Sequence, residues 1–266
     1  MAYREKYLVH WTGKDKDTNN KTTPEECIKI LSSILSDGFL MSTPEETLRG
    51  DGDSTIEYKI PMVCFTEINI GQSQNHAEKF GPIGIVVNRK YVLNRYGGPV
   101  HYVRNSGPET VVQTASILYK YFDHLTKNHH AIPPKGFITR EELIQLQQDG
   151  ATETQYKLNV FRQRLESWIG FIKNMSDERD DFSLLEEMEW RICLTPKLKN
   201  ITDLVKKNKS GNFYIAIETQ CLEGIAFLNE DLKRIALNHE GISEFSANPS
   251  VFMGTIDEWK EKLKND

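Results

Sequence analysis

The sequence has few cysteines and no long apolar run, and each absence excludes a class of protein. Its four cysteines stand far apart, with no C-x-x-C pair among them. This spacing argues against a zinc ribbon or a disulfide framework and favours reduced thiols in the cytoplasm. No run of about 18 apolar residues occurs and the first residues are charged, so we expect neither a membrane span nor a secretory signal.

Standard motifs of nucleotide-binding and hydrolytic enzymes are also missing. The chain contains no G-x-x-x-x-G-K-[ST], G-x-G-x-x-G, G-x-S-x-G or H-E-x-x-H sequence. The pair His129-His130 has no cysteine or acidic residue close by, so we expect a solvated loop there and no metal site. A net charge of −5 over 266 residues disfavours a protein that coats nucleic acid with one large basic face.

What the sequence does contain is a mixed succession of strands and helices. Residues 6–11 predict a strand, because aromatic and β-branched residues dominate this segment. Thr23-Pro24-Glu25-Glu26 is a capping box that predicts the start of a helix, and Gly38 predicts its end. A second capping box begins at Thr255. Apolar runs predict six further strands, at 60–66, 83–87, 100–103, 188–194, 213–217 and 224–228.

A helical block separates the two β-rich parts of the chain. It includes an amphipathic stretch from Tyr156 to Ile172. Strands and helices do not alternate regularly, so an α+β fold is favoured over a doubly wound parallel sheet. Neither β-rich part would bury enough surface alone, and we expect the two to complete one sheet. The prediction is one domain over 1–266 with a helical insertion at about 108–182; a separate helical domain is the alternative.

Two short segments carry side chains suited to holding a planar, polar ligand. His10 and Thr12 are two residues apart, so on a strand they point to the same face. Phe65 and Thr66 end a predicted strand, where an aromatic ring can stack on a planar group. Taken singly, a buried polar pair and the end of a core strand explain these segments more simply.

A third segment is richer in charge. The period of two places Glu187, Glu189 and Arg191 on one face of a predicted strand, with Trp190 on the other. Two carboxylates beside an arginine are costly to desolvate unless they interact or titrate. Such a pattern is unusual for a structural strand, although an exposed edge strand would tolerate it.

Taken together and in this order, these segments resemble the ADP-ribosyltransferase superfamily. The likeness is carried by four segments in chain order, 10–12, 34–40, 65–66 and 187–189. Within the superfamily, the chain is most similar to AbiGi-type abortive-phage-infection proteins, through residues 63–67, 81–85 and 187–191. More distantly it resembles DarT-like toxins that modify nucleic acid. A narrower resemblance is to the ADP-ribosylating toxins of chaperone-linked toxin–antitoxin systems, of the CmdT type.

The resemblance implies a split, twisted β-sheet with NAD⁺ bound in its cleft and no metal. On this basis His10 would bond the adenosine-side ribose, and Thr12 would hold the nicotinamide half. Phe65 or Phe80 would stack on the nicotinamide, and Thr66 would complete the cofactor site.

The same resemblance implies two catalytic carboxylates. Glu189 would bond the 2′-hydroxyl of the nicotinamide ribose and stabilise the positive charge that develops as nicotinamide leaves. Glu187 would orient or deprotonate the acceptor.

The function implied is an NAD-dependent ADP-ribosyltransferase toxin of a bacterial abortive-infection system, acting in the cytoplasm. Its acceptor would be nucleic acid, RNA ahead of DNA (mRNA or single-stranded DNA), and its partners a cognate antitoxin and a chaperone. The alternative is a non-catalytic module of the same fold that neutralises a partner toxin, because the AbiGi type has itself been labelled an antitoxin. A third possibility is an unrelated domain in which these motifs occur by chance.

Two parts of the sequence are candidates for contact with a partner molecule. Residues 197–209 hold five lysines against Asp203, and four basic residues, Arg89, Lys90, Arg95 and Arg104, flank the other side. This rim could hold a phosphate backbone, and ordinary solvated loops explain it equally well. The predicted helix face with Trp168, Phe171, Ile172 and Met175 is a candidate for partner contact, although packing on the sheet is the simpler expectation.

Overall fold

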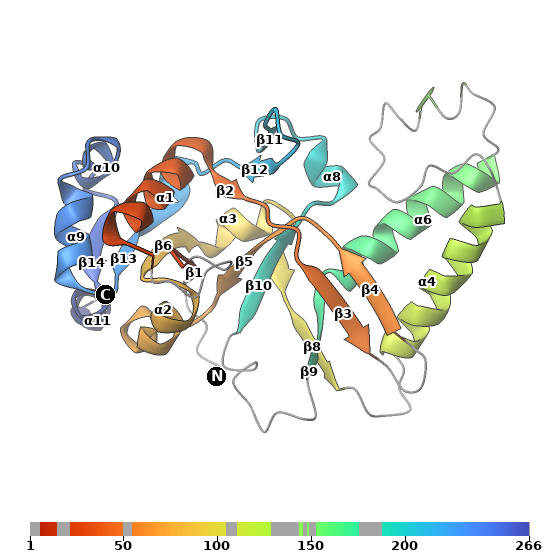
Figure 1. Ribbon diagram of the computed structural model, residues 1–266, viewed down its shortest axis with the longest axis horizontal. Helices are drawn as coiled ribbons and strands as arrows, with labels where there is room; N and C mark the ends of the chain where they lie inside the picture. The colour runs from red at the N-terminus through yellow and green to blue at the C-terminus, as the bar shows by residue number, and fades with distance from the viewer. Residues whose placement is uncertain are drawn as a thin grey trace.

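The computed structural model describes most of the chain. The described residues are 6–14, 22–49, 55–104, 111–128, 144–145, 148, 153–175 and 188–265. Glu187 and the pair His129-His130 lie outside them. The architecture is α+β, as the sequence predicts, with a twisted multi-stranded sheet between helices (Figure 1).

A seven-stranded sheet forms the centre, in the spatial order β14-β13-β6-β1-β5-β10-β7. Its strands are β1 (Tyr7–Thr12), β5 (Met62–Thr66), β6 (Ile83–Asn88), β7 (Gly98–Pro99), β10 (Glu189–Cys193), β13 (Leu222–Phe227) and β14 (Phe252–Thr255). Neighbours are antiparallel except for the parallel pair β13 and β14. Because β10 pairs with β5, the segments before and after the helical block complete one sheet, as predicted.

Three smaller sheets accompany the central one. A three-stranded sheet has the order β11-β12-β2, formed by β11 (Val205–Lys207), β12 (Phe213–Ile215) and β2 (Phe39–Leu40). An antiparallel pair joins β3 (Glu45–Arg49) to β4 (Thr55–Lys59). A parallel pair joins β8 (His101–Arg104) to β9 (Ile172–Met175).

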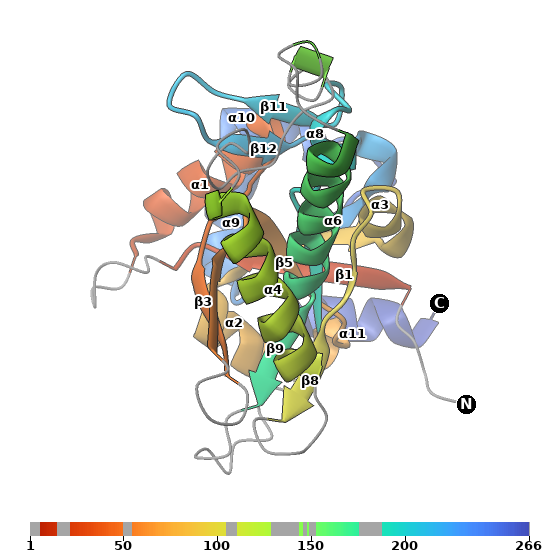
Figure 2. The same cartoon turned by 90° about the vertical axis from the view of Figure 1, so that its right-hand side faces the viewer.

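The helices cover both faces of the central sheet. Their bounds are α1 (Pro24–Asp37), α2 (Gln74–Phe80), α3 (Arg89–Leu93), α4 (Val111–Asn128), α6 (Glu153–Ile169), α8 (Pro196–Lys199), α9 (Glu230–Leu237), α10 (Glu240–Ser246) and α11 (Ile256–Asn265). Short 3₁₀ turns occupy Ile70–Gln72 and Thr219–Cys221. Figures 1 and 2 show α4 and α6 side by side at one end of the molecule, and these two helices contact each other.

The two faces of the sheet bury different clusters. Leu8 of β1 faces a cluster that includes α1, α9 and α10, whereas the next residue, Val9, faces α11 and α2 on the opposite side. Further along that opposite side, β3, β4, α4 and α6 cover Met62 and Cys193. The period of two in each strand therefore decides on which side of the molecule a side chain lies.

The helix boundaries follow the predicted caps. The Thr23 hydroxyl accepts from the Glu26 amide, and the Glu26 carboxylate accepts from the Thr23 amide at 2.8 Å. The second capping box is present at Thr255 and Glu258, with distances of 2.7 and 3.3 Å. Gly38, at φ +98°, ends α1 beside β12, where an added Cβ would lie 2.2 Å from the carbonyl oxygen of Ile215. Both caps and this helix end are confirmed.

The helical block differs from the prediction at its end. Helix α6 stops at Ile169, and Ile172 begins a strand rather than continuing the helix. Gly170 follows the last helical residue in a tightly packed position, where an added Cβ would lie 2.9 Å from the Cys193 sulfur and 3.3 Å from Ile60. Ile172 is buried and Trp168 is 42% exposed, so the predicted helix face running from Trp168 to Met175 is wrong.

Within the described residues, none of the helices combines the length and the apolar character that crossing a membrane requires.

Candidate functional site

The charged strand predicted from the sequence lies at the centre of the molecule. In β10, Glu189 pairs with Thr66 of β5 and Arg191 pairs with Cys64. Glu189 and Arg191 therefore share one face, and they are only 8% and 1% exposed. The Arg191 Nε donates to Glu189 Oε1 at 2.7 Å. Of the alternatives that the sequence leaves open for this face, an interaction between a carboxylate and the arginine is the one that the structure shows for this pair.

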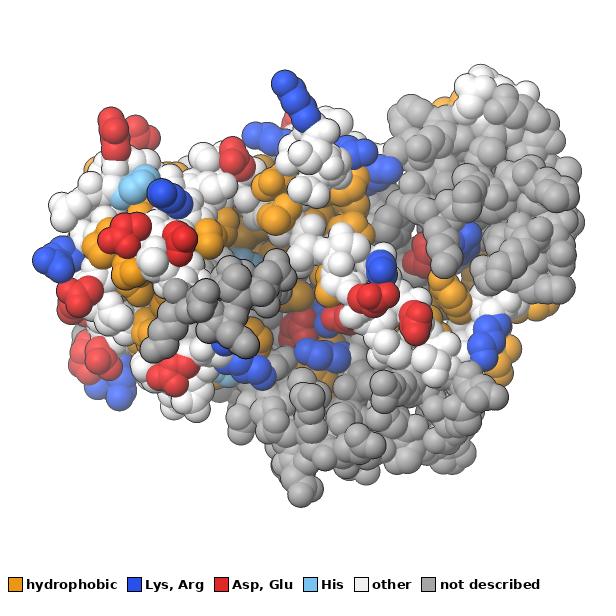
Figure 3. Space-filling model, viewed as in Figure 1, with side chains coloured by type: hydrophobic (Ala, Val, Ile, Leu, Met, Phe, Trp, Pro, Cys, Tyr) orange, Lys and Arg blue, Asp and Glu red, His pale blue; other side chains and the backbone are white. Residues whose placement is uncertain are grey.

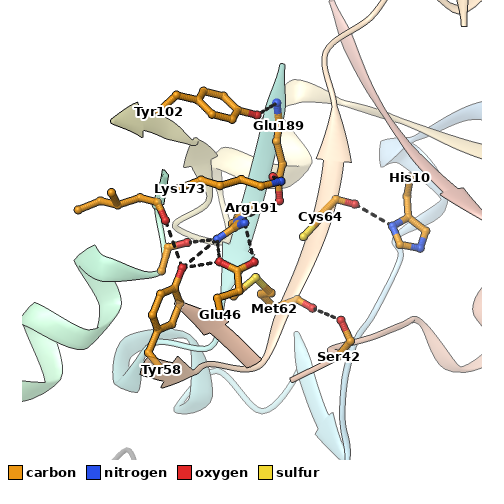
Figure 4. Close-up of polar contacts among 12 residues, drawn as sticks. His10, Ser42, Glu46, Tyr58, Met62, Cys64, Tyr102, Lys173, Glu189 and Arg191 are labelled. Carbon is orange, nitrogen blue, oxygen red and sulfur yellow. Dashed lines mark hydrogen bonds and ion pairs between the residues drawn. The ribbon is translucent and has the colours of Figure 1, made fainter. Parts of the chain in front are cut away.

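The rest of the guanidinium binds the β3–β4 pair. Two Arg191 nitrogens donate to the two carboxylate oxygens of Glu46, at 2.9 and 2.8 Å (Figure 4). A further bond of 2.8 Å reaches the carbonyl oxygen of Gly170, at the end of α6. The Tyr58 phenol donates to Glu46 and lies 3.1 Å from the carbonyl oxygen of Ile172.

A second cation completes the set. Lys173 Nζ, from β9, lies 3.0 Å from Glu189 Oε2. We call Glu46, Tyr58, Lys173, Glu189 and Arg191 the Arg191 cluster. It holds two carboxylates and two cations, and it ties β10 to β3, β4 and β9.

The electrostatics of the cluster fix its protonation. Burial alone would raise the pKa of Glu189, but Arg191 and then Lys173 outweigh burial and lower that pKa to about 2. Burial raises the pKa of the neighbouring Cys64 thiol, and the Glu189 charge raises it further, so Cys64 stays protonated at neutral pH. Glu189 is thus a charged carboxylate with each oxygen already bound to a cation of the chain itself.

Two of the residues predicted to bind the cofactor, His10 and Phe65, lie on the face of the sheet opposite Glu189. Val9 and Glu189 both pair with Thr66, so these three side chains share one face. The rings of His10 and Phe65 lie on the other face, with centroids 5.8 Å apart. The register of the sheet therefore separates His10 from Glu189.

His10 and Phe65 belong to an aromatic cluster. The His10 ring packs 4.9 Å from Phe39, and its Nδ1 lies 2.8 Å from the carbonyl oxygen of Cys64 (Figure 4). Phe65 is 2% exposed and touches Phe39 and Tyr91, so its ring faces are occupied by protein. The structure thus uses the Phe65 ring for packing in the core.

The remaining predicted residues lie apart. Thr12, two residues after His10, is half-buried at the end of β1 and shares the face of His10. Thr66 is buried on the face of Glu189. Phe80 is 37% exposed at the end of α2, with Lys79 Nζ 5.0 Å from its ring centroid. The assignment of these residues, and of Glu187, to NAD⁺ chemistry stays a prediction.

Two arginines from the predicted phosphate rim are used inside the protein. Arg89 forms an ion pair with Glu67, which also accepts from the Trp190 indole at 2.8 Å. Arg95 is 1% exposed and forms an ion pair with Glu218. Of the two explanations left open for these arginines, neither a phosphate-holding rim nor an ordinary solvated loop describes Arg89 and Arg95, because each is bound to a carboxylate of the chain.

Three members of the Arg191 cluster were not predicted from the sequence, namely Glu46, Tyr58 and Lys173. The alternating segment TIEYK at 55–59 was available as a strand signal, and its Ile and Tyr are buried. A buried arginine also demands a carboxylate partner. Nothing in the sequence, however, identifies Glu46 as that partner, since it lies 145 residues from Arg191.

Within the part of the chain that the structure describes, no three His, Cys, Asp or Glu side chains gather so as to hold a metal ion.

Comparison with known proteins decides between the expectations. Residues 42–238 match the family model described as "Putative abortive phage resistance protein AbiGi, antitoxin". The chain belongs to the AbiGi family. The predicted likeness to abortive-infection proteins is confirmed. Neither the curated proteins nor the solved structures include a match to this AbiGi chain.

The family description overturns the main functional prediction. AbiGi is described as an antitoxin, so the reading of this chain as an NAD-dependent ADP-ribosyltransferase toxin is wrong. The matched residues include the whole Arg191 cluster, whereas His10 and Thr12 lie before the match begins.

Proposed function

We propose that this AbiGi chain is a non-catalytic antitoxin that binds a partner toxin of an abortive-infection system and silences it. The observation that carries the proposal is the match over residues 42–238 to a family described as an antitoxin. The chemistry of the Arg191 cluster supports it independently.

A catalytic glutamate must present a carboxylate oxygen to its substrate. Both oxygens of Glu189 bind cations of the chain, at 2.7 and 3.0 Å, and the side chain is 8% exposed. Such a carboxylate stabilises the fold by compensating Arg191, because breaking a buried ion pair leaves an uncompensated charge. This supports a structural role for the E-x-R strand.

The separation of His10 and Phe65 from Glu189 also supports a non-catalytic role. His10 and Phe65 pack on the face opposite Glu189, among aromatic rings. An antitoxin that acts by binding requires a stable scaffold and an accessible surface rather than a convergent cleft, and this arrangement supplies the scaffold.

Purified components test the proposal. The chain is expressed with the toxin encoded beside it, isolated through a tag on the chain, and the complex is sized in solution. We expect a stable complex of the two proteins and inhibition of the toxin's activity. In parallel, the chain alone is incubated with NAD⁺, and we expect no release of nicotinamide. Absence of a complex, or nicotinamide release that Glu189→Gln abolishes, would contradict the proposal.

A further inference from the structure

A cavity opens between β4, α6 and the three-stranded sheet β11-β12-β2, here called the small sheet. It has a volume of about 700 Å³, within the range of small-molecule pockets. One side of its lining comes from β3 and β4, and another from α8 and the small sheet. The buried residues of the lining include Ile60, Ile169 and Leu194. The cavity therefore offers a molecule of suitable size an apolar floor.

Aromatic rings add to this floor. Tyr58, Tyr119 and Phe213 all line the cavity. The Tyr58 hydroxyl is occupied within the Arg191 cluster, so this residue offers the cavity its ring. The Lys207 ammonium lies 5.4 Å from the centroid of the Phe213 ring. Because flat apolar groups stack on such rings, the lining favours a ligand with an apolar or aromatic body.

The strand period of two decides which lysine of the small sheet faces the cavity. Lys207 of β11 pairs with Phe213 of β12, and both residues line the cavity. The neighbouring pair, Lys206 and Tyr214, points to the other side of the small sheet. Lys206 is thus an exposed lysine that adjoins Lys207 in sequence but faces away from the cavity.

Two carboxylates of the lining are already paired. Glu45 forms an ion pair with Lys59 at 3.1 Å, and Glu166 forms one with Arg162 at 3.0 Å. Glu57 of β4 also lines the cavity and is exposed. It makes no ion pair with any residue that the structure describes. Glu57 is therefore the carboxylate that remains for a ligand.

The cations that remain for a ligand lie on another side. Lys207 makes no ion pair within the described part of the chain, and its ammonium lies near the Phe213 ring. Lys199 of α8 also lines the cavity. Figure 3 shows basic side chains over α8 and the small sheet, and acidic side chains over β3 and β4. The charges that a ligand meets are thus separated, negative on β4 and positive on the small sheet.

This separation distinguishes between ligands of different charge. A simple anion would pair with Lys207 but would also face Glu57, and a simple cation would pair with Glu57 but would also face Lys207. A molecule that carries both an ammonium and a carboxylate compensates both residues, and an apolar body between the two charges covers the floor.

We infer that the cavity binds a dipolar small molecule with an apolar or aromatic body. Its ammonium pairs with Glu57, its carboxylate pairs with Lys207, and its body contacts Phe213 and the apolar floor. This is the chemistry of an amino acid or of a short peptide with free termini. The inference is independent of the proposed antitoxin function, which concerns a protein partner.

Chemically blocked ligands test the two charges separately. The probes are phenylalanine and the dipeptide leucyl-phenylalanine, each also as its N-acetyl and its C-terminal amide form, in calorimetric titrations of the full chain. We expect an unblocked probe to bind, and either block to weaken binding about fivefold, as expected for the loss of one partly exposed ion pair. The tighter of the two unblocked probes distinguishes an amino acid from a peptide as the ligand.

Substitutions identify the residues that meet each charge. Glu57→Gln should weaken the unblocked probe about fivefold and leave the N-acetyl form unchanged, because that form has no ammonium to pair. Lys207→Met should weaken the unblocked probe equally and leave the amide form unchanged. The matched controls are Lys206→Met and Glu223→Gln, which change the charge of exposed residues outside the described lining. Both controls should bind like the wild type.

Three results would overturn the inference. They are no binding of any probe at millimolar concentration, a blocked form that binds as tightly as its parent, and equal losses in Lys206→Met and Lys207→Met. Circular dichroism and thermal melting establish that each variant is folded. Complex formation with the co-encoded toxin is measured separately, so failure of the ligand site leaves the antitoxin function standing.

Discussion

His10 and Glu189 lie on opposite faces of one sheet, two strands apart, with β5 between them. His10 packs against Phe39 and Phe65, whereas Glu189 binds Arg191 and Lys173. The resemblance assigned both residues to one NAD⁺ site. In the structure His10 packs in the aromatic cluster and Glu189 belongs to the Arg191 cluster, on the other face of the sheet.

Arg191 should be critical for stability. Replacing it with methionine leaves the buried Glu189 and the partly buried Glu46 without their shared cation, and we expect a loss of about 3–5 kcal/mol in the free energy of unfolding. The matched control is Arg234→Met, because Arg234 is exposed and pairs only with the exposed Asp231. That change should cost less than about 0.5 kcal/mol. Urea denaturation measures both, and equal losses in the two variants would contradict a structural role for the cluster.

The stability of the protein should depend on acid through Glu189. Its pKa falls from 4.5 to about 2 on folding, so the folded state favours the charged carboxylate. The resulting stabilisation is fully present above pH 4.5 and is lost as the pH falls toward 2. Glu189→Gln removes this titration. We therefore expect the difference in unfolding free energy between wild type and Glu189→Gln to shrink from pH 6 to pH 3; a constant difference would show that Glu189 is not held as described.

Gly38 should be required for the position of the small sheet. It has a φ of +98°, and an added Cβ would lie 2.2 Å from the carbonyl oxygen of Ile215. Gly211 provides the control, because its φ is +88° but the nearest atom to an added Cβ lies 3.9 Å away. Alanine at either position costs about 1–2 kcal/mol for the left-handed backbone. Only Gly38→Ala adds a collision with β12, so its melting temperature should fall further.

Local signals in the sequence were sufficient for much of the fold. The capping boxes at Thr23 and Thr255 and the apolar strand runs act over a few residues, and the structure confirms them. The shared face of Glu189 and Arg191 was also predictable, because the strand period of two is a local property.

Other features depend on contacts between distant segments. The registers of β1 with β5 and of β5 with β10 decide whether His10 and Glu189 share a face. A shift of one residue in either register would place the two side chains on the same face. The partnership of Glu46 with Arg191 joins segments 145 residues apart. The toxin function was predicted wrongly because the order of these motifs does not distinguish a toxin from an antitoxin of the same family.

Growth after induced expression tests the central claim most directly. Three strains express the wild-type chain alone, its co-encoded toxin alone, and the two together. We expect the toxin alone to arrest growth, the wild-type chain alone to be harmless, and the strain that expresses both to grow normally. Arrest by the chain alone, relieved by Glu189→Gln or by the co-encoded protein, would contradict the antitoxin function.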